Sequence, residues 1–167
     1  MRQRDRQRNR AYLAESALRN FLKEEELTLE EANDFAKDVW PPIKQVNFTR
    51  NQSCWWHHGT STIDLARWGR TELTLLHEIA HAIREASCIV DETHGRIWAS
   101  IFCFLVFFYL GADAHKLLCL VYDAANIQHR LKTLEWFKIA SAMRYVMDEA
   151  LLEAANETWI TQIRVWR

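Results

Sequence analysis

The sequence predicts an α+β protein that is mostly helical, with a small antiparallel or mixed sheet of two to four strands. Gly and Pro are scarce, at 4 and 2 of 167 residues, and hydrophobic residues make up 49% of the chain, as in a helix-rich globular protein. Most segments place apolar residues three and four positions apart. Two short stretches within residues 43–65 instead alternate apolar and polar residues. The length suits one compact domain over residues 1–167.

Two helices are expected in the N-terminal part, residues 1–40. In residues 5–23 apolar side chains recur at helical spacing, at Tyr12, Leu13, Ala17, Leu18, Phe21 and Leu22. Thr28 and Glu31 form a capping-box pattern, which starts a second helix that extends to about residue 38. Pro41 and Pro42 end it, because proline lacks the backbone donor that a continuing helix needs.

Residues 43–127 are expected to form the sheet and the core that carries the functional site. Val46 with Phe48, and then Ile63 with Leu65, alternate with polar residues and predict two short strands. Between them lies NQSCWWHHGTS at residues 51–61. If the strand at 63–65 follows the edge of a cleft, its backbone can hold an extended peptide by strand addition, with WWHHG above the site. The alternative is a surface hairpin whose tryptophans cover the core.

Four further helices are expected, at residues 71–86, 95–110, 113–125 and 131–155. The most hydrophobic run, IWASIFCFLVFFYL at 97–110, is shorter than the roughly 20 apolar residues that span a bilayer. It therefore predicts a central core helix, and Gly111 suits a left-handed helix end. Residues 128–167 form a C-terminal helical extension. Within it, the pattern of residues 158–166 fits a strand and a frayed helix equally.

Charge and cysteine usage exclude several classes of protein. The formal net charge is −1, so no strong field attracts nucleic acid or an anionic membrane. The four cysteines form no CxxC pair, and no apolar stretch of a secretory signal follows Met1. These features favour the cytoplasm. The start RQRDRQRNR could bind phosphate, but its Asp5 and the acidic KEEEL that follows favour a solvated helix start instead.

The informative motif is LLHEIAHAI at residues 75–83. His77 and His81 lie four positions apart, so a helix projects both from one face. Two imidazoles at this spacing can bind one Zn²⁺ at roughly 2.0–2.1 Å. Glu78 lies beside the first ligand, where its carboxylate can take a proton from a zinc-bound water. The alternative is a helix whose histidines only pack, but apolar neighbours and an available third ligand disfavour it.

A catalytic zinc site needs a third protein ligand and an open position. The candidates are His94, Asp91, Glu92 and Glu85. Glu85 lies about 12 Å along the helix from His77, which is too far to share the ion. The loop before residue 95 can return His94 to the histidine pair, and Gly95 permits a close approach. We therefore favour His94, with Asp91 and Glu92 as alternatives.

These motifs carry a family resemblance. HEIAHAI followed by HGRIW resembles the HExxH…HGxxF/W pattern of SprT-like (Spartan-type) metalloproteases. The segments RDRQRNRAYLAE, ARWGRTELTLLHEIAHAI and HGRIWASIFCFLVFFYLGADAHKLL are more similar to small zincin-type metallohydrolases of actinobacteria and their phages, over residues from about 4 to 127. The resemblance implies a zincin-like fold whose sheet lies beside the active-site helix, with His77, His81 and His94 as zinc ligands and Glu78 as general base. A phage origin would place the protein in the host cytoplasm.

The expected function is a zinc-dependent hydrolase, in particular a metallopeptidase that acts on a protein or peptide. It also needs a donor for the developing oxyanion, for which the sequence offers His57, His58, Arg67, Arg70, Arg96, Tyr109 and His115. His115 and His129 otherwise suit packing roles. A different class is a regulatory or DNA-associated binding module with a structural zinc. A third is a SprT-like protease for DNA-bound proteins, which the near-neutral charge disfavours.

Overall fold

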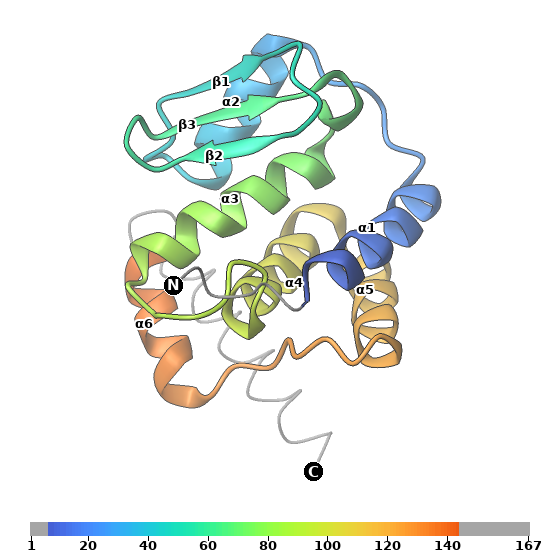
Figure 1. Ribbon diagram of the computed structural model, residues 1–167, viewed down its shortest axis with the longest axis vertical. Coiled ribbons are helices and arrows are strands. Elements are labelled where there is room, and N and C mark those ends of the chain that lie inside the picture. The colour runs from blue at the N-terminus through green and yellow to red at the C-terminus, as the bar shows by residue number, and fades with distance from the viewer. Residues whose placement is uncertain (1–6, 144–167) are drawn as a thin grey trace.

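The structure of the chain, a computed structural model, describes residues 7–143 (Figure 1). The α+β class is confirmed, since the described chain is mostly helical and has one small mixed sheet. Its elements are, in order, α1 (Arg8–Leu22), α2 (Leu29–Val39), β1 (Gln45–Phe48), β2 (Trp55–His57), β3 (Thr62–Leu65), the 3-10 turn η1 (Arg67–Gly69), α3 (Glu72–Ala86), α4 (Arg96–Leu110), α5 (Ala112–Ala124) and α6 (Thr133–Met143).

The sheet has three strands in the order β1-β3-β2. β1 runs parallel to β3, with Val46 opposite Ile63, and β2 runs antiparallel to β3, with Trp56 opposite Ile63. The two predicted strands are present, and the WW loop supplies a third. The alternative in which the strand at 63–65 follows the edge of a cleft is wrong, because β3 is the central strand of the sheet. The edge strands are β1 and β2, and of these two β2 supplies residues that line the cleft.

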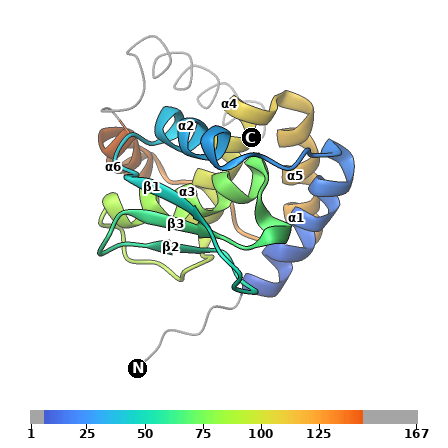
Figure 2. The same cartoon turned by 90° about the horizontal axis from the view of Figure 1, so that it is seen from above.

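Helices α2 and α3 lie on the same side of the sheet (Figure 2). Ile63 and Leu65 of β3 are buried, while Thr62 and Asp64 alternate to the other side, as the two-residue period of a strand requires. Helix α3 also packs against α2, α4 and α6. Its residues from Leu73 to Ile83 are therefore all buried, which fixes the helix that carries the histidine motif in the centre of the molecule.

Local signals in the sequence set the helix ends. The capping box of α2 is present, because the Glu31 backbone N–H donates to Thr28 Oγ1 at 3.3 Å and the Thr28 N–H donates to Glu31 Oε2 at 2.8 Å. Gly111 takes φ 92° between α4 and α5, which an L side chain rarely adopts. Within residues 7–143, the bounds of the six predicted helices agree with the observed ones to within a few residues. The predictions for residues 144–155 and 158–166 lie outside the described part.

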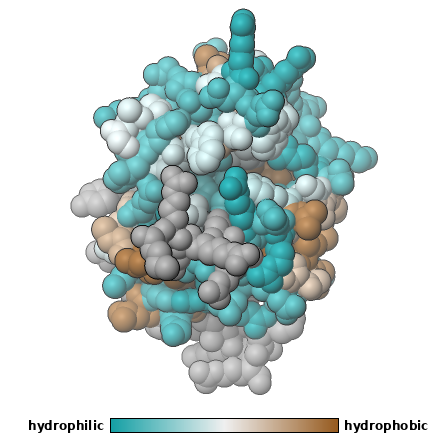
Figure 3. Space-filling model, in the orientation of Figure 1, coloured by the Kyte–Doolittle hydropathy of each residue, from teal (hydrophilic) through white to brown (hydrophobic). Residues whose placement is uncertain are grey.

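The apolar run at residues 97–110 forms α4, and its residues from Ile97 to Val106 are buried in the core. Among the helices that the structure describes, none combines the length and the hydrophobicity that crossing a membrane requires. Figure 3 shows mainly hydrophilic side chains on the face seen in Figure 1, with hydrophobic side chains gathered toward its two sides. The long apolar segment is therefore used for the interior.

An ion pair joins the start of α4 to α6. Both terminal nitrogens of Arg96 donate to the Glu135 carboxylate, and these hydrogen bonds lower the pKa of Glu135 to about 2. A free Glu titrates near 4.3, so the pair stabilises the fold above that pH, and the stabilisation is lost as the pH falls through the lowered pKa.

We expect Glu135→Gln to lower the free energy of unfolding by about 1–2 kcal/mol at pH 7. Urea unfolding of the variant and the wild type at pH 7 and pH 3 measures the difference, which should shrink at the lower pH. A difference that does not change with pH would show that the charge of Glu135 is not involved.

Candidate metal centre and active-site cleft

Helix α3 brings His77 and His81 together on one buried face. The helix starts at Thr71, whose hydroxyl accepts the Thr74 N–H, and the two histidines follow one turn apart. Their Nε2 atoms lie 3.2 Å from each other. The structure thus confirms that both imidazoles project toward one point, as the spacing predicted.

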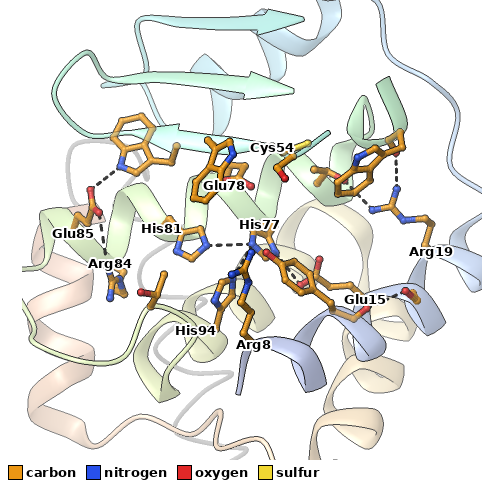
Figure 4. A pocket seen from close by; sticks show the side chains of 18 residues that line it. Arg8, Glu15, Arg19, Cys54, His77, Glu78, His81, Arg84, Glu85 and His94 are labelled. Carbon is orange, nitrogen blue, oxygen red and sulfur yellow. Dashed lines mark hydrogen bonds and ion pairs between the residues drawn. The ribbon is translucent and has the colours of Figure 1, made fainter. Parts of the chain in front are cut away.

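His94 joins this pair from the loop before α4. Its Nε2 lies 3.3 Å from Nε2 of His77, and the side chain is buried. The three donor nitrogens all lie within 4.8 Å of one another. Figure 4 shows the three rings, from α3 and from the loop, converging at the floor of a cleft. Of the candidate third ligands, His94 is the one that the fold brings to the pair.

Asp91 shapes the loop that carries His94. Its carboxylate accepts the backbone N–H groups of Glu92 and Ile97, both at 2.8 Å, and so caps the start of α4. A Cβ on Gly95 would lie 2.4 Å from Asp91 Oδ2. Asp91 therefore positions the ligand rather than joining the cluster, and Gly95 is required because the carboxylate occupies the space of a side chain.

The geometry of the three nitrogens suits a metal ion. A tetrahedral ion with bonds of about 2.0–2.1 Å holds two nitrogen donors about 3.3–3.4 Å apart, close to the observed 3.2 and 3.3 Å. Nδ1 of His77 donates to Glu15 Oε1 at 2.8 Å, which leaves a lone pair on the Nε2 that faces the other rings. The triad can thus hold a metal ion.

Glu15 of α1 orients the first ligand. The Glu15 carboxylate is buried together with His77. Burial lowers the pKa of His77, whereas the charge and the hydrogen bond of Glu15 raise it, and the net result is a raised pKa. A carboxylate behind a ligating imidazole fixes its tautomer and increases its basicity. Sequence reasoning missed Glu15 because 62 positions separate it from His77, and its only local signal is an acidic residue among the buried Ala11, Ala14 and Leu18 of α1.

We expect Glu15→Gln to weaken metal binding about 10- to 100-fold, because the amide cannot supply the negative charge behind His77. Competition of the purified protein with a chromogenic zinc chelator gives the affinity. The exposed Glu25, in the segment after α1, provides the matched control, since Glu25→Gln should leave the affinity unchanged. Equal affinities for the two variants would contradict the proposed role of Glu15.

Glu78 is buried between the histidines and β2 (Figure 4). Burial raises the pKa of its carboxyl group, while His77 and a hydrogen bond from the backbone N–H of Trp56 oppose the rise. A partly desolvated carboxylate of raised pKa is a stronger base than a free one. The hydrogen bond also ties Glu78 to the edge strand.

The cleft above the histidines has a volume of about 950 Å³ and is lined by residues of α1, the segment around β2, η1, α3 and the His94 loop. Trp55 and Trp68 line it and are each more than half exposed, at 53% and 55%. Trp56 is half-buried and its indole N–H donates to Glu85 Oε2 at 2.7 Å. The WW segment thus combines both predicted roles, since Trp56 packs against the core while Trp55 remains available in the cleft.

Two donors from α1 reach the histidines. The ring of Tyr12 stacks on His77, with centroids 5.5 Å apart, and lies 5.4 Å from His94. The Tyr12 hydroxyl forms a hydrogen bond with Arg8, which extends from the start of α1 toward the cluster (Figure 4). Residues 8, 12, 15 and 19 follow helical spacing along one face of α1, and all line the cleft.

The donors that the sequence suggested lie elsewhere in the described chain, and none of the seven lines the cleft. His57 pairs with Asp64, Arg70 with Glu26 and Arg96 with Glu135. His58 contacts Glu85, Tyr109 contacts Phe35 and His115 contacts Cys119. Arg67, in η1, is not among the residues that line the cleft.

Part of the arginine-rich start is used within the protein. Arg8 lines the cleft, and Nη1 of Arg10 donates to the backbone oxygens of Ala125 at 2.9 Å and Asn126 at 3.2 Å. The remaining arginines of RQRDRQRNR lie outside the described residues. The two described ones thus act in the cleft and in the packing of α1 on α5.

Comparisons of the chain with protein-family models, with curated proteins and with solved structures gave no match. The resemblance to zincin-type and SprT-like enzymes therefore stays an expectation from the motifs. The function is therefore inferred from the geometry of the cleft.

Proposed function

We propose that this protein is a zinc-dependent hydrolase, specifically a metallopeptidase. The observation that carries the proposal is the convergence of three imidazole nitrogens beside a buried carboxylate in an open cleft. Zinc sites with three protein ligands are typical of catalysis, whereas structural sites have four. Within residues 7–143 the group that could hold a metal ion consists of His77, His81 and His94, and three protein ligands favour the catalytic kind over a binding module with a structural zinc.

Zinc bound there would supply Lewis-acid polarisation of a carbonyl and acidify a water molecule. Glu78 accepts the proton of the attacking water and delivers it to the leaving amine. The hydrogen bond from Trp56 and the contact with His77 hold the carboxylate beside the histidines. Glu15 keeps His77 in the tautomer that directs Nε2 to the common centre.

Tyr12 and Arg8 are the residues that we assign to the developing oxyanion. A hydroxyl and a guanidinium are both strong donors, and donors placed in advance stabilise charge that appears in the transition state. Their hydrogen bond to each other and the stacking of Tyr12 on His77 hold them over the ligands. Helix α1 thereby supplies Glu15, which orients the ligand His77, as well as the two oxyanion donors.

A peptide is the substrate that fits the cleft. β2 is an edge strand whose one side pairs with β3, and its other side lies beside Glu78. An extended chain can pair with such an edge through its backbone groups. Trp55 and Trp68 offer exposed apolar surface in the same cleft, so we expect a preference for bulky apolar side chains.

Metal analysis and cleavage of an unbiased peptide library test the proposal. Mass spectrometry of the purified, zinc-loaded protein should show one equivalent of zinc and new peptide termini that carry ¹⁸O when the reaction runs in labelled water. Chelation of the metal should stop the cleavage. A zinc-loaded protein that cleaves no peptide or denatured protein under these conditions would refute the peptidase assignment.

We expect Tyr12→Phe to lower kcat about 10²- to 10³-fold, the cost of removing one oxyanion donor. The stacking on His77 needs only the ring, so zinc content and melting temperature should stay at the values of the wild type. Tyr109→Phe is the matched control, because the ring of Tyr109 packs against Phe35 away from the cleft. A Tyr12→Phe enzyme of normal kcat would exclude the hydroxyl from the reaction.

A further inference from the structure

A second cluster of reactive side chains lies between α4 and α5, apart from the cleft. Cys103 belongs to α4, His115 and Cys119 lie one turn apart on α5, and His129 follows in the next loop. Nε2 of His115 lies 3.3 Å from the Cys119 sulfur. The Cys103 thiol and the His129 ring are also in hydrogen-bond contact with that sulfur. One sulfur therefore has three potential donors around it.

This environment favours the thiolate of Cys119. The hydrogen bond from Cys103 is the largest influence, and those from His115 and His129 add to it, so the pKa of Cys119 lies well below the usual range although burial opposes the shift. Burial has the opposite result for Cys103, whose pKa is raised. The two thiols thus differ in pKa, so that Cys119 favours the reactive thiolate while Cys103 keeps its proton.

The arrangement differs from that of a metal site. A Cys₂His₂ zinc site places all four donor atoms around a common centre, whereas here three groups surround the sulfur of Cys119. Within the part of the chain that the structure describes, the only group of three or more such residues whose donor atoms all lie within 4.8 Å of one another is the histidine triad. A purely structural thiol, in turn, is surrounded by apolar atoms, which does not describe Cys119.

We propose that Cys119 is a site of oxidation by peroxides, with Cys103 as the resolving thiol. The thiolate sulfur of Cys119 attacks one oxygen of hydrogen peroxide, the O–O bond breaks, and the hydroxide that leaves takes up the proton that the Cys119 thiol had released, which gives water. Cys119 is then a sulfenic acid. The sulfur of Cys103 loses its proton and attacks Cys119, the S–O bond breaks, and the hydroxide that leaves takes up a proton. Two thiols and one peroxide give one disulfide and two waters.

The position of the pair suits this chemistry. Helices α4 and α5 pack side by side (Figure 1), so a disulfide would link neighbouring elements. Cys119 is partly exposed, which admits a small oxidant, while Cys103 is buried. The remaining cysteines serve as internal controls, since Cys88 is exposed and burial raises the pKa of Cys54 to about 11.

Peptide mapping of the intact chain after brief exposure to hydrogen peroxide tests the proposal. In the wild type we expect a Cys103–Cys119 disulfide that forms at least tenfold faster than Cys88 is oxidised. In Cys103→Ser, dimedone should trap the sulfenic acid at Cys119. If Cys88 reacts as fast as Cys119, exposure rather than environment sets the reactivity and the proposal is overturned.

Two further variants separate the alternatives. His115→Leu keeps apolar packing against Phe107, whose ring lies 5.3 Å from that of His115, but removes a donor, so oxidation of Cys119 should slow severalfold at an unchanged melting temperature. An unchanged rate would count against the thiolate environment. Zinc analysis of Cys119→Ser should give the wild-type stoichiometry. Loss of a zinc equivalent would instead identify the cluster as a metal site and overturn the proposal.

Discussion

Glu78→Gln should leave one equivalent of zinc bound and lower kcat by about 10²- to 10⁴-fold, the range that a general acid–base residue contributes. The amide has nearly the same size as the carboxylate, so it can stay between His77 and β2. It cannot accept a proton from the attacking water. Steady-state kinetics on a peptide that the wild type cleaves, together with metal analysis of the same preparation, measures both quantities.

The control for this variant is Glu72→Gln, a change of the same kind on the same helix. Glu72 lies in the first turn of α3, away from the histidines and partly exposed, so its variant should keep full activity. Equal kcat values for Glu78→Gln and the wild type would remove Glu78 as the base. A loss of zinc from Glu78→Gln would mean that the carboxylate supports the metal centre as well.

The sequence was sufficient for the parts of the site whose geometry is local. The one-turn spacing of His77 and His81 is a property of any helix, and the capping box at Thr28 fixes a helix start within four residues. His94 was predictable because the motif, the loop length and Gly95 lie close together in the chain. The structure adds the reason for Gly95, which is the carboxylate of Asp91 packed against it.

The parts contributed by α1 could not be predicted in the same way. Tyr12 belongs to the apolar pattern of the helix, and Glu15 lies among its buried positions, but neither observation indicates that this helix covers a site on α3. Their role arises from the packing of α1, which includes the hydrogen bonds from Arg10 to the end of α5. The seven oxyanion donors suggested by the sequence were wrong for the same reason, because a polar residue type alone does not determine which residues come together in the cleft.

The order of the strands in the sheet could not be predicted from the sequence pattern either. Alternation of apolar and polar residues identifies a strand but not its neighbours, and Ile63 and Leu65 suit an edge strand as well as a central one. The three residues of β2 are too few for a periodic signal. Their position at the edge results from pairing with β3, with Trp56 opposite Ile63, and this pairing places the WW segment over the cleft.

His94→Ala should weaken zinc binding on the order of a thousandfold. Zinc in a fully liganded protein site is bound by about 10–16 kcal/mol, and the loss of one of three ligands removes roughly a third of such a free energy. Chelator competition measures the affinity. Because a ligand that binds the folded state stabilises it, zinc should also raise the melting temperature of the wild type and have little effect on the variant at the same concentration.

The matched control for His94→Ala is His58→Ala, which removes an imidazole that is exposed and pairs with Glu85. Its zinc affinity and its zinc-dependent shift in melting temperature should equal those of the wild type. Unchanged zinc affinity in His94→Ala would show that another residue is the third zinc ligand. Glu92 would be tested first, because the Asp91 carboxylate is already held by two backbone N–H groups. The assignment depends on the imidazole of His94 itself, because the loop that carries it would stay capped by Asp91 in the variant.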